Sequence, residues 1–312
     1  MAQDTPSYGG QAVIEGVVMR GPRYVSLSVR KPEGDIYSMT KRSLSPSQRS
    51  SFMRLPIIRG AFAFGDSLSL GVEMLVKSAE IAAPDEEKPA KAAINLGVAL
   101  GVVLAVGLFI LLPAVITPYA VGALHVQGRL LSSLVETFMR LAILVAYIAL
   151  VFRMPEISRV IEYHGAEHKV IWAWERNYAD ILDKARNEKW DKPQIVEYLA
   201  GKACKESRLH PRCGTSFLFI VVLCTWIVFL FVSPPTMLAR VGIRLALLPF
   251  AAGLSYEVLK ASADKDNLFW RLIRAPGMGL QSLTTREPDQ AELEVAADSL
   301  VHLVEVERGA FR

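Results

Sequence analysis

The chain has 312 residues, of which 52% are hydrophobic and 21% are charged, and its net charge is +4. Soluble globular proteins are about 45–50% apolar, and here the excess is gathered in blocks, which is typical of a membrane protein. A net charge this small, without a clustered basic face, does not indicate a nucleic-acid partner. The cysteines are too few and too irregularly spaced for a disulfide framework, so we expect reduced thiols in a cytosolic compartment. They are Cys204, Cys213 and Cys224.

The first 49 residues predict a small β-meander that carries a glycine-rich motif. Residues 1–10 are polar and contain no apolar core, so we expect no cleavable signal peptide. Strand-like pieces at 11–20, 24–30 and 35–40 are separated by turn signals containing glycine and proline. An irregular loop is the alternative.

Residues 50–91 predict an amphipathic helix followed by a charged linker. The helix covers 50–83, with a break at Pro56 or Gly60, and carries too many charges to be a good membrane span. We expect it to lie at the membrane surface or to pack on the spans. Residues 84–91 form the linker.

Four apolar blocks predict a multi-pass α-helical membrane protein. They cover residues 92–117, 131–152, 216–232 and 238–259, and a span needs roughly 20 apolar residues. The first pair of spans therefore falls in 92–152 and the second in 216–260. Residues 153–215 form a loop domain between the pairs, and residues 261–312 form a tail that ends in a docked helix.

The distribution of lysine and arginine predicts the orientation of these spans. Residues 153–212 contain twelve such residues, whereas 118–130 and 233–240 contain one each. Basic connections stay in the cytosol, so we expect both termini and the loop domain on the cytosolic side.

Two charges inside the predicted spans lie at similar depth. Glu136 lies in the second span and Arg244 in the fourth. Ions in hydrocarbon seek partners, which predicts that these spans are neighbours and that Glu136 faces Arg244. Arg140 competes for Glu136 because it lies at the i,i+4 position.

The densest group of chemically active residues is the sequence EYHGAEHK at 162–169. On a helix His164 and His168 share one face, a spacing that suits two imidazoles on one metal ion. Glu167 is a candidate catalytic base, and the order H-x-x-E-H is that of inverted zincins. Glu167 lies about 100° around the helix from His168, so an orientation away from the metal stays open. The alternatives are a polar helix surface and a metal-free acid–base role.

A second group, HPRCGTS at 210–216, offers a third ligand directly before the third span. His210 is the first candidate because Pro211 stiffens its turn. Cys213 is the second, because a thiolate binds tightly and suits a structural site. The alternative is a helix cap by the hydroxyl groups that follow.

Two further acids are candidates for the same site. Glu15 lies in an apolar, strand-like run, where it acts as a ligand or pairs with Arg20 or another arginine. Glu257 closes the last span, where an acid is a functional candidate unless it pairs with Lys260. All of these residues are predicted on the cytosolic side of the membrane.

At these motifs the chain resembles the bacterial DUF1385 family, also called the YqhQ family. That resemblance implies a multi-pass protein of the bacterial inner membrane that is of unknown function and predicted to be metal-dependent, without assigning roles to residues. It rests on these blocks: GGQAVIEGVVMRGP (9–22), LPIIRG (55–60), EYHGAEHK (162–169), LHPRCGTSF (209–217), GLSYE (253–257) and APGMGLQSLTTREPD (275–289).

Residues and resemblance together favour a membrane-embedded, metal-dependent enzyme, possibly a hydrolase. His164 and His168 would bind a divalent metal such as Zn²⁺, completed by His210, Cys213 or a carboxylate, and Glu167 would activate water. Its partners would be the lipid bilayer and an unknown substrate, for example a lipid or a peptide. The alternative is a non-catalytic membrane scaffold or assembly factor whose polar motifs form a structural network, and a transporter ranks third.

Overall fold

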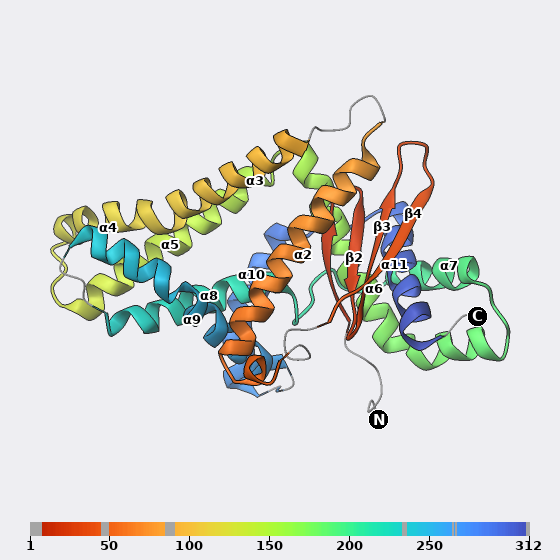
Figure 1. Cartoon of the computed structure of the whole chain (residues 1–312). Helices are drawn as coiled ribbons and strands as arrows, with labels where there is room; N and C mark the ends of the chain where they lie inside the picture. The colour runs from red at the N-terminus through yellow and green to blue at the C-terminus, as the bar shows by residue number, and fades with distance from the viewer. Residues whose placement is uncertain are drawn as a thin grey trace.

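The computed structural model describes residues 8–44, 50–84, 91–232, 236–263, 265 and 267–309. Long apolar helices extend to one side of the molecule, and a small sheet with its covering helices lies on the other (Figure 1). We call the second part the peripheral layer; it contains the sheet and helices α6, α7 and α11. The charged linker predicted at 84–91 falls mostly on residues 85–90, outside the described residues.

The sheet is an antiparallel meander in chain order, which confirms the predicted topology. Its strands are β1 (Gly9–Val13), β2 (Gly16–Arg20), β3 (Tyr24–Arg30) and β4 (Ile36–Arg42). The first predicted strand-like piece is a hairpin, because Val13 pairs with Gly16 and leaves Ile14 and Glu15 as its turn. Glu15 has a φ of 48°. Its assignment to the interior of a strand was therefore wrong.

Helices cover both faces of the sheet. Helix α2 (Ile58–Ala82) packs on one face, where Met74 contacts the inward valines and leucine of β3. The other face packs against α6 (Pro155–Arg186) and α11 (Gln290–Arg308), with α7 (Lys192–Ala203) behind them. Apolar residues on both sides of β2 and β3 therefore make this a three-layered unit, which Figure 1 shows on the right.

Helix α2 also joins the peripheral layer to the membrane helices. The helix predicted at 50–83 is interrupted near Pro56, one of the two predicted break points, and α2 begins at Ile58. It crosses α9 (Met237–Ala263) at a pair of glycines. A Cβ added to Gly60 would lie 2.7 Å from the carbonyl oxygen of Gly253, so the close approach depends on glycine. Beside this crossing, Arg59 Nε donates to Glu257 Oε1 at 2.7 Å. The predicted packing of this helix on the spans is confirmed.

Three helical segments are long and apolar enough to cross a membrane: residues 92–123, 129–151 and 241–262. The first contains α3 (Lys91–Val106), a π-helical turn (Gly107–Leu111) and α4 (Leu112–Ala123); the second is α5 (Arg129–Val151) and the third lies in α9. The predicted third span is the apolar helix α8 (Gly214–Leu230), which has only 17 residues. At 1.5 Å per residue it is about 26 Å long, slightly shorter than the roughly 30 Å hydrocarbon core.

The predicted charge pair between spans is confirmed. Arg244 Nη2 lies 2.7 Å from Glu136 Oε2, and Arg140 Nη2 lies 2.5 Å from Glu136 Oε1. Nη2 of Arg244 also lies 2.6 Å from Oε1. The competing partner therefore does not displace the predicted one, because the two oxygens of a carboxylate can accept hydrogen bonds from both guanidinium groups.

The tail contains one helix that was predicted and one that was not. Helix α11 is the docked helix expected at the end of the chain, and Asp289 and Glu292 begin it with a capping box. Helix α10 (Leu268–Thr284) was missed; it packs on α8 and exposes Leu268 and Phe269. Its last turn reaches the candidate site.

Candidate metal centre

Helix α6 presents His164 and His168 side by side, as their spacing predicted. The centroids of the two imidazole rings are 4.5 Å apart. His164 is partly buried, whereas His168 is 1% exposed and is packed among the core residues of the peripheral layer. Both residues lie in the first half of α6, which follows the apolar helix α5.

Backbone carbonyl groups fix the orientation of both rings. Nδ1 of His164 lies 2.8 Å from the carbonyl oxygen of Thr284, and Nδ1 of His168 lies 2.6 Å from that of Arg208. A carbonyl oxygen only accepts hydrogen bonds, so in both rings Nδ1 carries the proton and Nε2 offers a lone pair. Histidines that bind metals are held in this way by a neighbouring acceptor.

Cys213 completes the group from a different segment. Its Sγ lies 3.2 Å from Nε2 of His164, and the ligand atoms of His164, His168 and Cys213 all lie within 4.8 Å of one another. Cys213 is also the N-cap of α8, where Sγ accepts the backbone N–H of Thr215 at 3.4 Å. A helix N-terminus favours negative charge, which suits a thiolate ligand.

These residues fit a transition-metal ion such as zinc. With Zn–N and Zn–S bonds near 2.1 and 2.3 Å, a tetrahedral ion needs ligand atoms about 3.5 Å apart. The ligand atoms lie within 4.8 Å of one another, so they would move together by up to about 1.3 Å to bind such an ion. Nε2 of His168 is buried and has no hydrogen-bond partner among the described residues, so an ion would satisfy an atom that is otherwise costly to bury.

Glu167 lies next to the group and does not face away from it. Its Oε2 is 4.0 Å from Nε2 of His164, because the i,i+3 spacing places the two side chains on the same face. Burial raises the pKa of Glu167 to about 7. The charge of His164 and a hydrogen bond from the backbone of Gly10 both lower this pKa, but by less than burial raises it. A Cβ on Gly10 would lie 2.7 Å from the Glu167 side chain, so glycine leaves room for the carboxylate.

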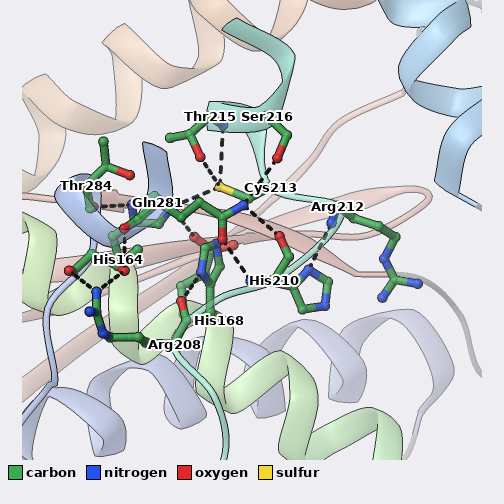
Figure 2. A network of polar contacts seen from close by, with 12 residues as sticks. His164, His168, Arg208, His210, Arg212, Cys213, Thr215, Ser216, Gln281 and Thr284 are labelled. Carbon is green, nitrogen blue, oxygen red and sulfur yellow. Dashed lines mark hydrogen bonds and ion pairs between the residues drawn. The ribbon is translucent and has the colours of Figure 1, made fainter. Parts of the chain in front are cut away.

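His210, the first candidate for the third ligand, does not join the three ligand atoms. Its ring packs against Trp172 at 4.7 Å and lies 5.7 Å from the ring of His168. Figure 2 shows that the ring turns toward Arg212, whose backbone nitrogen is 3.4 Å from Nδ1. The structure thus places Cys213, the second candidate, beside the histidine pair. Burial lowers the pKa of His210 to about 3.

The remaining candidate acids are ion-paired elsewhere. Both oxygens of Glu15 accept hydrogen bonds from Arg159, at 2.7 and 2.9 Å. Glu257 pairs with Arg59 instead of Lys260. Neither acid belongs to the group that holds the two histidines.

Residues that the sequence did not single out hold the site together. Gln281 of α10 is fully buried; it accepts the backbone N–H of His210 and donates to the carbonyl oxygen of the same residue, both at 2.8 Å. Arg208 Nη1 donates to Thr285 Oγ1 at 2.8 Å (Figure 2). Residues 208–213 and 281–285 are thereby tied to each other and to α6. Gln281 lies in the sequence block APGMGLQSLTTREPD, but the sequence of this block does not predict that Gln281 binds the backbone of His210.

Comparisons with known proteins identify a family without describing an activity. The family described as "Protein of unknown function (DUF1385)" matches residues 55–194 and 196–306. The chain is 29% identical to "Uncharacterized protein YqhQ" of Bacillus subtilis (strain 168) over 318 residues, which cover 97% of this chain and 93% of that protein. No solved structure matches significantly. Neither description names a metal, so metal dependence is not supported by the family and rests on the geometry of the site. The chain belongs to the DUF1385 family.

Proposed function

We propose that this protein is a metal-dependent membrane enzyme of the hydrolase type, with its centre at His164, His168 and Cys213. The observation that carries the proposal is the pair of imidazoles held at Nδ1 by carbonyl groups, whose ligand atoms lie within 4.8 Å of each other and of Sγ of Cys213. Three protein ligands are the usual complement of a catalytic zinc site, which keeps a further position open.

The residues around the centre have separate roles in this proposal. When bound, the ion supplies Lewis-acid chemistry and lowers the pKa of water that it holds. Glu167 accepts and returns a proton, because its carboxylate is 4.0 Å from a ligand nitrogen and forms no ion pair with a lysine or arginine among the described residues. Thr284 and Arg208 keep the two imidazoles in the required tautomer through their carbonyl groups.

The position of the centre in the fold suits a substrate at the membrane surface. Cys213 begins the apolar helix α8, and His164 is the tenth residue of α6, which follows the membrane helix α5. We place this surface on the cytosolic side of a bacterial inner membrane, because the basic residues are concentrated in 153–212. A reporter fused at Asp183 should then read cytosolic, and one inserted at Gly122 external. An external reading at Asp183 would contradict this orientation.

Cobalt substitution tests whether the centre is open. Co²⁺ reports thiolate ligation and coordination number through its absorption spectrum, and the probe is acetohydroxamate, a small chelating anion. In the enzyme proposed here, acetohydroxamate changes the spectrum of the Co²⁺ protein. Glu167→Gln should retain the Co²⁺ spectrum, since Glu167 is not a ligand. A spectrum that does not respond to acetohydroxamate would show a closed site.

The second candidate function is a scaffold in which the metal is structural. It is favoured by the burial of Cys213 and His168 and by the way the ligands join α6 to α8. In that case the ion would fasten the peripheral layer to the membrane helices, and the closed-site result of the cobalt experiment would be the expected one.

A further inference from the structure

A cavity of about 330 Å³ lies among the membrane helices, away from the metal centre. Side chains of α4, α5, α8 and α9 line it, including Thr117, Glu136, Phe229 and Arg244. It lies near the C-terminal ends of α4 and α8 and the N-terminal ends of α5 and α9. Cys213 begins α8 at the opposite end of that helix, so the cavity and the metal centre lie toward opposite faces of the membrane.

The charges at this cavity do not balance. Arg129, Glu136 and Arg244 line it, and Arg140 binds the same carboxylate from outside the lining. Among the described residues, one carboxylate therefore binds two guanidinium groups, and a third guanidinium group, that of the exposed Arg129, also lines the cavity. Arg140 and Arg244 are 13% and 10% exposed at their side chains, and burying charge without a counter-charge is costly in hydrocarbon.

The geometry leaves donors of the cluster unused. Nη2 of Arg244 donates a hydrogen bond to Glu136. Nη1 of Arg244 and Nε of Arg140 are both buried and have no hydrogen-bond partner among the described residues. Both guanidinium groups lie over the ring of Phe229, with distances of 5.3 and 5.5 Å to its centroid. A cation–π contact steadies an arginine but does not neutralise it.

We propose that this cavity binds a phosphate-type oxyanion. The guanidinium group matches the oxygens of phosphate with paired donors, and the hydroxyl groups of Thr117, Ser132 and Ser133 add polarity to the lining. The ligand supplies the negative charge that the cluster of Arg129, Arg140 and Arg244 lacks.

The depth of the cavity fits a lipid headgroup as the source of the phosphate. Glu136 and Arg244 each lie seven residues into their helices, counted from Arg129 and Met237. At 1.5 Å per residue this is about 10 Å from the helix ends, near the boundary between headgroups and acyl chains. A free phosphate ion offers the same chemistry, and the experiment separates the two sources.

Thermal unfolding of the full-length protein in a neutral detergent provides the test. The probes are dioleoyl-phosphatidylglycerol, the zwitterionic dioleoyl-phosphatidylcholine, and sodium phosphate at constant ionic strength. Phosphatidylglycerol should raise the unfolding temperature saturably, and phosphatidylcholine should not. An equal effect of sodium phosphate would identify the free ion as a sufficient ligand.

Two variants that are expected to change phosphatidylglycerol binding in opposite directions make the test specific. Arg244→Gln should weaken phosphatidylglycerol binding about tenfold or more, the loss expected for a charged hydrogen bond. Glu136→Gln should strengthen binding, because it removes the carboxylate that competes for the arginines. Arg59→Gln, an arginine outside the cavity, should bind like the wild type. No stabilisation by either phosphate source, or the same stabilisation in Arg244→Gln and Glu136→Gln, would overturn the proposal and leave the metal centre unaffected.

Discussion

Replacing Gly165 by alanine tests whether the crossing of residues 284–288 over α6 positions His164. A Cβ at Gly165 would lie 2.0 Å from the carbonyl oxygen of Arg286, whereas carbon–oxygen contacts are normally about 3.3 Å or longer. The backbone on one side must therefore move by more than about an ångström. Overpacking of this kind costs about 1–3 kcal/mol.

The same movement should weaken metal binding. The carbonyl group of Thr284 lies two residues before Arg286 and holds Nδ1 of His164 at 2.8 Å. Loss of such an outer contact lowers metal affinity about 10–100-fold. We expect Gly165→Ala to lower both the unfolding temperature, by several degrees, and the affinity for Zn²⁺, measured by competition with a chromogenic chelator.

Gly201 provides the matched control. It lies in helix α7, and a Cβ there would meet nothing within 4 Å. Gly201→Ala should raise the stability slightly, by about 0.5–1 kcal/mol, because alanine favours a helix over glycine, and should leave Zn²⁺ affinity unchanged. If both alanine variants behave alike in the two assays, the argument from the crossing at Gly165 is refuted.

Two further predictions concern buried polar groups. Burial raises the pKa of Glu292 from its ordinary value of 4.5 to about 7, although Arg159 lies 3.7 Å away. The folded protein therefore favours the protonated carboxyl group. The stability that this group contributes is lost as the pH rises from about 4.5 to 7. Glu292→Gln should unfold at a higher temperature than wild type at pH 8 but not at pH 4, and an unchanged pH dependence would contradict this. Gln281→Ala should lower the free energy of unfolding by about 1–3 kcal/mol, because it removes the acceptor of the buried N–H of His210 and one of the two donors to the carbonyl oxygen of His210, the other being the N–H of Cys213. The exposed neighbour Ser282→Ala is the control, and equal losses in both variants would reject the role of Gln281.

The β-meander and the membrane helices could be predicted from the sequence, because each depends on the residue types of one short segment. Strand-like segments separated by turn residues predicted the meander, and the long apolar blocks predicted the membrane helices. The pairing of Glu136 with Arg244 was also predictable, because membrane depth can be counted along each span and a buried charge needs a partner.

The choice between neighbouring ligands depended on the tertiary structure. His210 and Cys213 are three residues apart in one turn, and their order along the chain does not say which side chain faces α6. Gln281 fixes the backbone of His210, and the ring then packs on Trp172. The sequence offered no reason to expect Gln281 there, because α10 was not recognised as a helix.

The position of Glu15 was missed for a related reason. The sequence around an acid in an apolar run does not distinguish a single strand from a hairpin with the acid in its turn. The pairing of Val13 with Gly16 decides it, and the turn then sends the carboxylate to Arg159. Partners that lie more than a hundred residues apart in the chain are fixed by the docking of α6 on the sheet.

Metal content tests the central claim most directly. The full-length protein, purified without chelators, should contain stoichiometric zinc or another transition metal by elemental analysis, and His168→Ala and Cys213→Ala should lose it. Cys204→Ala removes an exposed thiol outside the site and should retain the metal, as should His210→Ala. A wild-type protein free of transition metal, or full retention in both His168→Ala and Cys213→Ala, would contradict the account.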